Sequence, residues 1–452
     1  MSEVEFVGQS AKDSDNGQAA TSRLINLYRE PIKMGDKTTY TLKSVLGQAV
    51  FADLNTVFVR AMADVSGKVY VAAGGGLYAV SGQAVATRLG DIADSEDTTV
   101  SGNTGSVTVC AGGKYYVWDG VTLTQPSIGA FSDFGAVEYI GNYTILTERG
   151  GRRVQWSALA DPTDLPGTSF ATTEARDDNN LRAMAIARNL WLFKEKSIEV
   201  WYITGQAAAG AFAPTGMVID TGLMSFGLVV KFRAGAFLVG DDGIVYLTDG
   251  EGLRPVSTTA VETAIDEETP KSCFYYEDEG HKICVIRFRN RPAWCFDVST
   301  GEWHERAEGA DHGPWAAVAA VNSYGKWLCG TDLGGIYEMT RNNTDIAYAM
   351  RRTAVSRTLS MEQRTFILDA LEFTGRVGRS DLGRDAECWI RVSRDNGLTW
   401  GNPKRRSLGG LGDYQQRITY RSLGQFRQAT IEFNMADPVD IPLNATAVVT
   451  AS

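Results

Sequence analysis

Histidine and cysteine are scarce in this sequence, and their scarcity argues against the usual metal centres. The 452 residues include three histidines and six cysteines, with no Cys-x-x-Cys pair. Zinc sites are built from closely spaced His and Cys ligands, so we expect no metal and no cofactor. The cysteines stand in apolar, strand-like surroundings, which predicts buried free thiols in a reducing compartment.

Long apolar runs are also missing. The longest run of small apolar residues, Trp315–Val321, is far shorter than the roughly 20 residues that a membrane-spanning helix needs. Met1–Val4 opens the chain without the basic and apolar segments of a signal peptide. We therefore expect a soluble chain that is made in a cytoplasm and has no membrane partner.

No long stretch has the apolar period of a helix, and only Ser257–Asp266 is predicted to be one. Ser257 or Thr258 would cap this helix, with Glu262 at a capping-box distance. Proline is scarce at 12 residues, whereas glycine is abundant at 48, alongside 10 Trp, 17 Tyr and 18 Phe. This mixture is typical of many tight turns between half-buried strands, so we predict an all-β chain.

The clearest local pattern is a β-meander over Gly235–Ser257. Two apolar runs, Ala236–Val239 and Ile244–Leu247, flank a turn with an Asp-Gly pair, which favours a hairpin because glycine adopts positive φ. A second turn, Asp249–Gly252, leads to a third strand. Similar units recur at Gly67–Gly82, Gly113–Leu123, Pro292–Arg306 and Lys326–Met339.

Degenerate meanders that return about every 40 to 50 residues predict the blades of a β-propeller. We predict a β-propeller of about six blades over residues 50–346, followed by an additional, separate β platform domain over residues 347–452. The N-terminal segment, residues 1–49, would be part of the platform. The rival fold is a pair of β-sandwiches, which would show strands but no meanders recurring at a regular interval.

Charge is spread unevenly along the chain. The formal net charge is −10, but residues 350–452 carry 15 Lys and Arg against 11 Asp and Glu, whereas residues 1–349 carry 29 against 43. A mildly basic platform on an acidic body indicates that the two parts meet different partners. A solvated surface of mixed sign is an equally good interpretation.

One octet in the platform matches the Asp-box pattern Ser-x-Asp-x-Gly-x-Thr-Trp at each defined position. Its residues are Ser393, Asp395, Gly397, Thr399 and Trp400. The carboxylate and hydroxyls can bond backbone groups of a turn, the glycine allows positive φ, and the tryptophan packs beneath. We interpret these five residues as a fold marker and not as an active site.

Around this octet the sequence resembles the C-terminal region of the packaged-DNA stabilisation proteins of short-tailed bacteriophages, which are also called tail accessory factors, tail hubs or nozzles. The resemblance is carried by Phe366–Phe373, Gly375, Gly378, Ser407–Gly409, Gly412, Tyr414, Arg417, Tyr420, Ser422–Gly424, Arg427 and Asp437–Val439. Ile25–Tyr28 with Glu30 is similar to the opening motif of that family, where proline usually stands in the place of Arg29. Ser257–Thr258 with Glu262 is similar to its middle signature.

The resemblance implies a structural virion protein, not an enzyme, with a propeller flanked by a β platform. Such proteins form a hexameric ring beneath the portal adaptor protein, extend the DNA channel, stabilise packaged DNA until ejection and offer docking surfaces to tail spikes, fibres or a needle. The chain would therefore be located in the virion tail, after assembly in the host cytoplasm. An acidic body suits a channel that passes double-stranded DNA without sequence-specific binding, because each neutralised phosphate would tighten the hold.

Two groups of residues are interface candidates on this interpretation. Leu27 and Tyr28 belong to an apolar island in a polar segment, so we expect them to be buried in the platform or at the joint between subunits. Arg405, Arg406, Arg417 and Arg421 are expected to face acidic neighbours in the assembly.

The alternative function is a glycan-binding or glycoside-hydrolysing propeller that is similar to sialidases, which carry Asp boxes. A glycosidase needs paired carboxylates that flank a sugar. Carboxylates are plentiful, but Asp241, Asp242, Asp249, Asp297 and Asp332 stand in predicted hairpin turns, where Asp is favoured for backbone reasons. We therefore name no catalytic residue.

Overall fold

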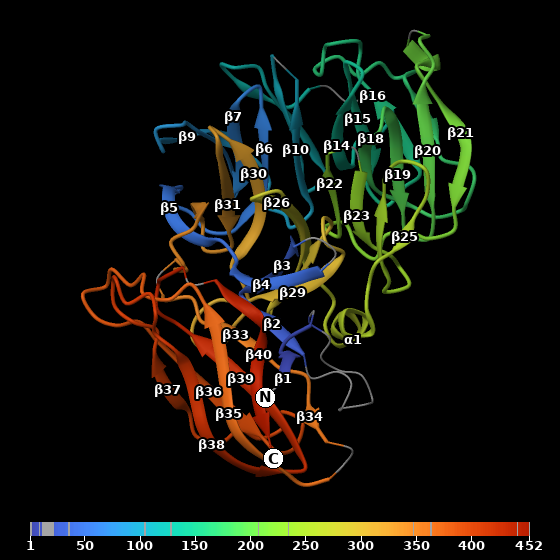
Figure 1. Cartoon of the computed structure of the whole chain (residues 1–452). Coiled ribbons are helices and arrows are strands. Elements are labelled where there is room, and N and C mark those ends of the chain that lie inside the picture. Colours follow the sequence, from blue (N-terminus) through green and yellow to red (C-terminus); the bar gives the residue numbers. More distant parts are fainter. Residues whose placement is uncertain are drawn as a thin grey trace.

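The computed structural model describes residues 2–8, 10, 22–34, 37–103, 105–126, 129–206, 208–233, 235–346, 348–361, 364–440 and 442–451. Part of the N-terminal segment predicted to join the platform, including residues 11–21, lies outside them. The described chain is almost entirely β-structure (Figure 1). Apart from a 3-10 turn, η1 (Ala208–Gly210), its only helix within these ranges is α1 (Thr259–Glu267), which confirms the helix that the sequence predicts.

The upper domain in Figure 1 is a β-propeller, as the sequence predicts. Within the described residues it has seven four-stranded antiparallel blades, where we expected about six. The innermost strand of blade one, β6, packs between β10 of blade two and β30 of blade seven, which closes the ring.

The blade strands follow one another along the chain. Blades one to four comprise β6 (Val59–Val65), β7 (Lys68–Ala73), β8 (Gly76–Val80), β9 (Ala86–Asp91); β10 (Thr98–Gly102), β11 (Val107–Ala111), β12 (Lys114–Trp118), β13 (Leu123–Thr124); β14 (Phe134–Ile140), β15 (Tyr143–Glu148), β16 (Arg153–Trp156), β17 (Phe170–Thr172); β18 (Asn180–Ile186), β19 (Asn189–Lys194), β20 (Ile198–Ile203) and β21 (Phe212–Ile219). Blades five and six comprise β22 (Val229–Phe232), β23 (Gly235–Val239), β24 (Val245–Thr248), β25 (Arg254–Pro255); β26 (Ser272–Asp278), β27 (His281–Arg287), β28 (Ala293–Asp297) and β29 (Glu302–Arg306).

Blade seven is completed by a strand from the other end of the chain. Its strands β30 (Ala317–Ser323), β31 (Lys326–Thr331) and β32 (Gly335–Thr340) are joined by β5 (Gly47–Asp53), which pairs antiparallel with β32 from Gly47 opposite Thr340 to Asp53 opposite Gly335. The propeller is thus closed by backbone hydrogen bonds between segments almost 300 residues apart in sequence.

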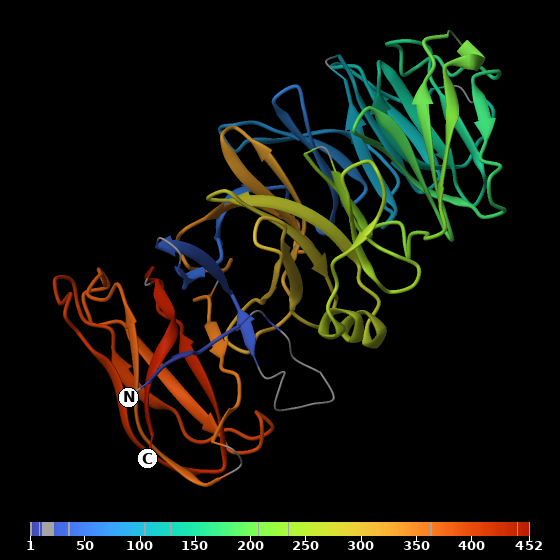
Figure 2. The ribbon, with the colours of Figure 1, turned by 45° about the vertical axis from the view of Figure 1, so that its right-hand side comes forward.

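The lower domain is a β-sandwich that contains both ends of the described chain (Figure 2). One sheet has the order β3 (Leu27–Met34), β4 (Lys37–Ser44), β40 (Leu443–Ala451), β35 (Phe366–Gly375) and β38 (Ile418–Phe426), and β1 (Ser2–Glu5) also pairs with β40. The other contains β2 (Arg23–Ile25), β33 (Arg352–Val355), β39 (Gln428–Met435), β36 (Glu387–Ser393) and β37 (Lys404–Ser407), with β34 (Leu359–Ser360) on β39.

Alternating side chains build the sandwich core. On β35, Phe366, Leu368, Leu371 and Phe373 are buried in one cluster with residues of the facing sheet, such as Ile431 and Phe433 of β39. Within each pair, Phe366 with Leu368 and Leu371 with Phe373, the period of two follows from the pleat of a strand. A β-bulge between Leu368 and Ala370 adds one residue between the pairs and so keeps both on the core face.

The platform is a second domain, but it shares a hydrogen-bonded sheet with the propeller, which our prediction of a separate platform did not include. The strand β2 pairs parallel with β29 of blade six, through Ile25 and Glu305, and antiparallel with β33 of the sandwich, through Leu24 and Ala354. One hydrogen-bonded sheet therefore runs from blade six into the sandwich. A strand of three residues can do this because both of its backbone edges are free to pair, which periodicity along the chain does not reveal.

Candidate interaction surfaces

The junction between propeller and sandwich is held by a buried polar network around Tyr28. The hydroxyl of Tyr28 donates to Asp278 Oδ2 at 3.2 Å and accepts a hydrogen bond from Arg341 at 3.3 Å. Arg341 also pairs with Asp278 at 2.6 Å. Burial and the Asp278 charge raise the pKa of Tyr28, so it stays a neutral donor. Leu27, one residue earlier, is buried in the sandwich core. Leu27 and Tyr28, the two interface candidates of the N-terminal segment, are thus both buried within one subunit.

All three histidines lie at this junction. The ring of His281 lies 4.9 Å from that of Tyr28 and bonds Asp297 at 2.7 Å, and that hydrogen bond raises the pKa of His281. The ring of His304 lies 5.9 Å from Tyr28, and burial lowers its pKa to about 4. His312 bonds Thr353 of β33 at 3.1 Å, and burial lowers its pKa to about 3. At neutral pH the last two are therefore uncharged parts of the packing.

A second buried cluster lies where β2, blade six and the loop after blade seven meet. Arg306 and Asp345 form an ion pair at 2.5 Å with both side chains fully buried, and Arg306 also donates to Asn26 Oδ1 at 3.1 Å. Arg352, also buried, donates to Ser44 and to the carbonyl of Val439. Removing one partner of the Arg306–Asp345 pair leaves an uncompensated charge, so this pair fixes blade six against the loop that leads to the sandwich. The sequence analysis missed these residues, because nothing in their spacing distinguishes them from surface charges.

A set of cations occupies one edge of the sandwich, where β37 and β38 run beside each other. We call Lys404, Arg405, Arg406, Arg417 and Arg421 the basic edge, and all five are exposed. Arg406 donates to the carbonyl of Thr419 at 2.8 Å, and Lys404 donates to that of Ser422 at 3.3 Å. These side chains therefore tie the two strand edges together and occupy carbonyls that another strand could use.

The other members of the basic edge differ in whether they already have an acidic partner. Arg405 pairs with Glu387 at 3.0 Å and lies 5.5 Å from the ring of Trp389. Arg417 and Arg421 form no ion pair with any described residue. The structure thus leaves these two arginines available to an acidic neighbour, whereas Arg405 and Arg406 are engaged within the chain.

The Asp-box residues form the turn between β36 and β37. Ser393 accepts the N–H of Gly397 at 2.8 Å, and Asp395 accepts the N–H of Thr399 at 2.8 Å. Gly397 has φ 88°, and the guanidinium of Arg391 lies 5.5 Å from the ring of Trp400. Hydrogen bonds from Ser393 and Thr399 lower the pKa of Asp395 to about 2. Each polar group is occupied in holding the turn.

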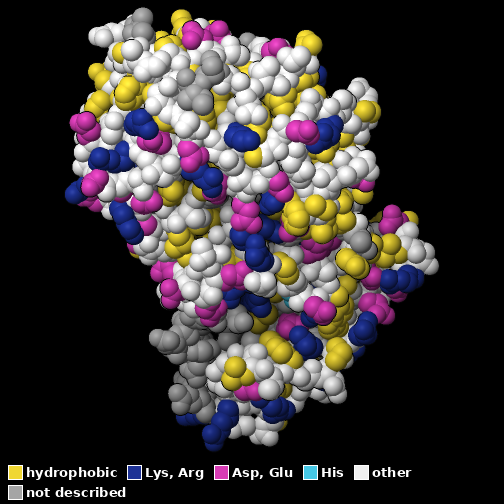
Figure 3. Space-filling view, turned by 180° about the vertical axis from the view of Figure 1, so that it is seen from behind, with side chains coloured by type: hydrophobic (Ala, Val, Ile, Leu, Met, Phe, Trp, Pro, Cys, Tyr) yellow, Lys and Arg dark blue, Asp and Glu magenta, His cyan; other side chains and the backbone are white. Residues whose placement is uncertain are grey.

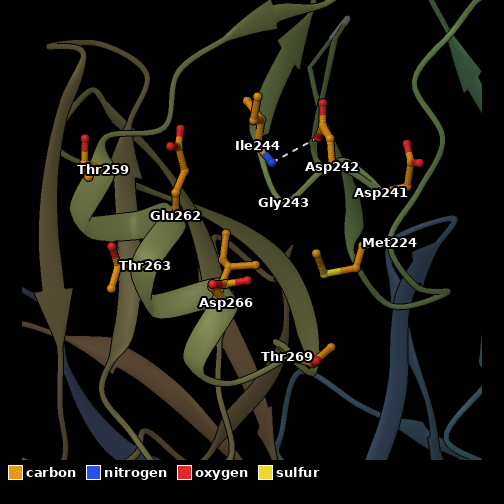
Figure 4. Close-up of a pocket in the computed structure, with 11 residues that line it drawn as sticks. Met224, Asp241, Asp242, Gly243, Ile244, Thr259, Glu262, Thr263, Asp266 and Thr269 are labelled. Carbon is orange, nitrogen blue, oxygen red and sulfur yellow. Dashed lines mark hydrogen bonds between the residues drawn. The ribbon is translucent and has the colours of Figure 1, made fainter.

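The carboxylates of the propeller turns have local partners. Asp242 accepts the N–H of Ile244 at 3.0 Å and the hydroxyl of Tyr246, whose pKa burial and this contact raise to about 12. Asp241 accepts the N–H of Gly222 at 2.7 Å and pairs with Lys196. Figure 4 shows both near a cavity of about 520 Å³, with Glu262 and Asp266 of α1 on its other side. Glu262 accepts the hydroxyl of Ser257 at 2.6 Å, and Thr258, which begins the helix, forms no side-chain cap.

The described residues contain neither a metal-binding cluster nor a membrane-spanning helix. No group of three His, Cys, Asp or Glu among them could hold a metal ion. No helix among them is long and apolar enough to cross a membrane. Figure 3 shows positive and negative side chains interspersed over the propeller rather than one field of a single sign.

Two family models match the chain, one after the other. Residues 6–343 match the model described as Bacteriophage P22 Gp10, beta-propeller, and residues 351–448 match the one described as Bacteriophage P22 Gp10, beta-sandwich. The boundary falls between β32 and β33, where the chain leaves blade seven for the sandwich. No curated protein matches the chain.

Several solved structures are similar to this chain at low identity. The WD40 domain of Neurospora crassa Pan2 has 9% identity over 65% of this chain and 94% of that one, with a TM-score of 0.42. BamB from Moraxella catarrhalis has 12% identity over 66% of this chain and 98% of that one, with a TM-score of 0.39. The computationally designed Ika8 protein has 13% identity over 74% of this chain and 100% of that one, with a TM-score of 0.41. At such TM-scores these likenesses carry no argument.

Proposed function

The chain belongs to the bacteriophage P22 Gp10 family of phage structural proteins, and on that premise we propose that it is the hub, or nozzle, of a short phage tail. In this role, six copies form a ring beneath the portal adaptor protein and extend its DNA channel. The ring stabilises packaged DNA until ejection and offers docking surfaces to tail spikes, fibres or a needle. The observation that carries the proposal is the match of the propeller and sandwich models, in order, over one chain.

The junction supports this role mechanically. A ring that holds packaged DNA bears load, and a subunit with two loosely tethered domains would yield at the tether. Here blade six and the sandwich share a sheet, and buried ion pairs such as Arg306–Asp345 brace the same region. We therefore expect each subunit to behave as one block in the ring.

The basic edge is the surface that we propose for contact with an acidic neighbour, the portal adaptor protein. The propeller carries the opposite net charge, so double-stranded DNA passes the acidic body without sequence-specific binding. We assign the chain no catalytic role, because the carboxylates of the propeller turns and of the Asp box are engaged in backbone and hydroxyl contacts. Hydrolysis of a glycan that is abolished by substituting one of these carboxylates would favour the alternative.

The test uses the arginines that have no acidic partner within the described chain. Arg417→Glu with Arg421→Glu is compared with a matched control, Arg88→Glu with Arg152→Glu, which reverses two exposed arginines of the propeller. Binding to the adaptor ring is measured by sedimentation over a series of salt concentrations. The first double variant should lose binding at low salt, and its difference from the unmodified protein should shrink as salt screens the contact. Equal binding by both double variants would refute this use of the basic edge.

A further inference from the structure

One mouth of the propeller axis holds a cavity that the hub role does not use. The inner strands β6, β26 and β30, which lie side by side in Figure 1, begin at this mouth. Residues at their starts, together with the end of β27 and the loop before β10, line a cavity of about 480 Å³. The mouth lies at the opposite end of β26 from Asp278, which contacts Tyr28, so it is distinct from the junction.

A carboxylate reaches across this mouth. Glu96, just before β10 of blade two, pairs with Lys271 at 2.9 Å and with Arg289 at 3.5 Å, and both cations belong to blade six. Blades two and six are separated by blades seven and one, so the contact spans the opening. The hydrogen bond from Lys271 lowers the pKa of Glu96, yet 61% of its side chain is exposed. Lys271 and Arg289 of blade six thus hold the exposed carboxylate of Glu96 from blade two. Because Glu96 is exposed to solvent, a carboxylate of a ligand can displace it from the two cations.

An apolar surface stands next to these cations. Phe58 is 46% exposed, and Val57 and Leu333 beside it are 52% and 60% exposed. Phe58 has φ 58°, a left-handed conformation that is unusual for an aromatic residue, and its N–H donates to the carbonyl of Asp332 at 3.2 Å. Strained residues of this kind are concentrated at sites that bind ligands. Here the strain presents an aromatic ring to solvent at the rim of a cavity.

The charges that line the cavity have the opposite sign to the rest of the propeller. Arg60, Lys271, Arg287 and Arg289 outnumber Glu96 and Asp332 in the lining, although Arg287 pairs with Asp332 and Arg60 pairs with Asp94 beside the cavity. Lys271 and Arg289, which share Glu96, therefore carry the local excess of positive charge, whereas residues 1–349 as a whole are acidic. An acidic ligand is therefore favoured locally. Nucleic acid is disfavoured, because the net negative charge of residues 1–349 repels its closely spaced phosphates. A single extended peptide segment fits a cavity of this size, which lies in the range of small-ligand pockets.

We propose that this mouth is a docking pocket for an acidic protein segment that carries an aromatic or aliphatic side chain. A carboxylate of the segment replaces Glu96 on Lys271 and Arg289, and the apolar side chain packs against Phe58. Glu96 acts as an internal competitor that keeps the pocket covered until such a segment arrives. The proposal does not depend on the hub role.

The test measures peptide binding to the full chain by fluorescence anisotropy. The probe is a fluorescein-labelled peptide of sequence Glu-Glu-Phe-Glu-Glu, with Lys-Lys-Phe-Lys-Lys and Glu-Glu-Ala-Glu-Glu as comparison peptides. Lys271→Glu with Arg289→Glu should weaken binding at least about tenfold. Glu96→Gln should strengthen it about two- to fivefold, the range expected for one exposed ion pair. Phe58→Ala should weaken binding of the Phe peptide but not that of the Ala peptide.

Arg188→Glu, in the exposed turn that follows β18 at the opposite end of blade four, serves as the charge control, and circular dichroism verifies that each variant is folded. Absence of binding to the unmodified protein and to Glu96→Gln alike would overturn the proposal. Equal binding of the Lys peptide, or binding that is insensitive to both the double charge reversal and Phe58→Ala, would overturn it too. Displacement of the probe by a DNA duplex more readily than by unlabelled peptide would assign the mouth to nucleic acid instead.

Discussion

Replacing Asp345 by Asn tests how far the buried Arg306–Asp345 pair fixes the junction. The change keeps the size of the side chain and removes its charge, so the fully buried guanidinium loses its only carboxylate partner among the described residues. Breaking a buried pair in this way costs about 3 to 5 kcal/mol of unfolding free energy. Arg306 retains neutral acceptors at Asn26 and Leu46. We therefore expect the lower end, about 3 kcal/mol.

The assay is urea unfolding followed by tryptophan fluorescence, because the ring of Trp315 lies 4.8 Å from the Arg306 guanidinium and reports on this region. Asp91→Asn is the matched control, since it removes the same charge from an exposed pair with Arg88 and should cost less than about 1 kcal/mol. Arg306→Met with Asp345→Leu should recover much of the loss, because an apolar pair leaves no unpaired charge. Equal losses for Asp345→Asn and Asp91→Asn would refute the reasoning.

Further predictions concern the histidines, the Asp box and two glycines. His304 has a pKa near 4 when folded and about 6.5 when unfolded, so only the unfolded chain takes up its proton between these values. His304 should contribute a fall of up to about 3 kcal/mol in the unfolding free energy as pH drops through this window. His312, whose folded pKa is about 3, adds to the decline, and His304→Gln should therefore flatten it only in part in urea titrations at several pH values. His281, whose pKa is raised, opposes this trend, because its contribution is present in acid and is lost as pH rises through its folded pKa. Asp395→Ala should lower the thermal midpoint of the sandwich, measured by near-ultraviolet circular dichroism, because the Thr399 N–H loses its acceptor; an unchanged midpoint would contradict the assigned role. Gly334→Ala would put a Cβ 1.7 Å from the Thr56 carbonyl at φ +91°, whereas Gly280→Ala has the same backbone strain, at φ +93°, with no atom within 4 Å. Gly280→Ala should cost about 1 to 2 kcal/mol in urea unfolding and Gly334→Ala clearly more, and equal costs would show that the close approach is unimportant.

The sequence predicted the elements whose signals are local. The hairpin of β23 and β24, the helix α1 and the propeller-plus-platform order all follow from turn residues and apolar runs. Blade four shows the limit of such signals. Its first hairpin turns at Ala187 and Arg188, both with positive φ and without glycine, so the chain offers no turn signal there. A blade of this kind is easily missed when blades are counted from glycine-rich turns.

Contacts between distant segments were not predictable from periodicity. The island Leu24–Tyr28 was expected to need cover, but the sequence does not reveal that its first residues pair with both β29 and β33. Likewise, a cluster of arginines in the sequence does not distinguish Arg406, which donates to a strand edge, from Arg421, which does not pair with a described carboxylate. The pairing of Leu24–Ile25 and the contacts of these arginines both depend on which strands become neighbours. Packing across the whole chain decides which strands these are.

The closing strand β5 also sets the order of events during synthesis. A ribosome adds about 5 to 20 residues per second, so β5 waits roughly 15 to 60 seconds before its partner β32 emerges. The strand β4 waits longer still for β40, which pairs with it through Asn444 and Leu443. Until then, both early strands have exposed backbone edges in the nascent chain. A prematurely terminated chain thus lacks the strands that complete blade seven and the sandwich. Only chains that have been translated to the end can therefore form both domains completely.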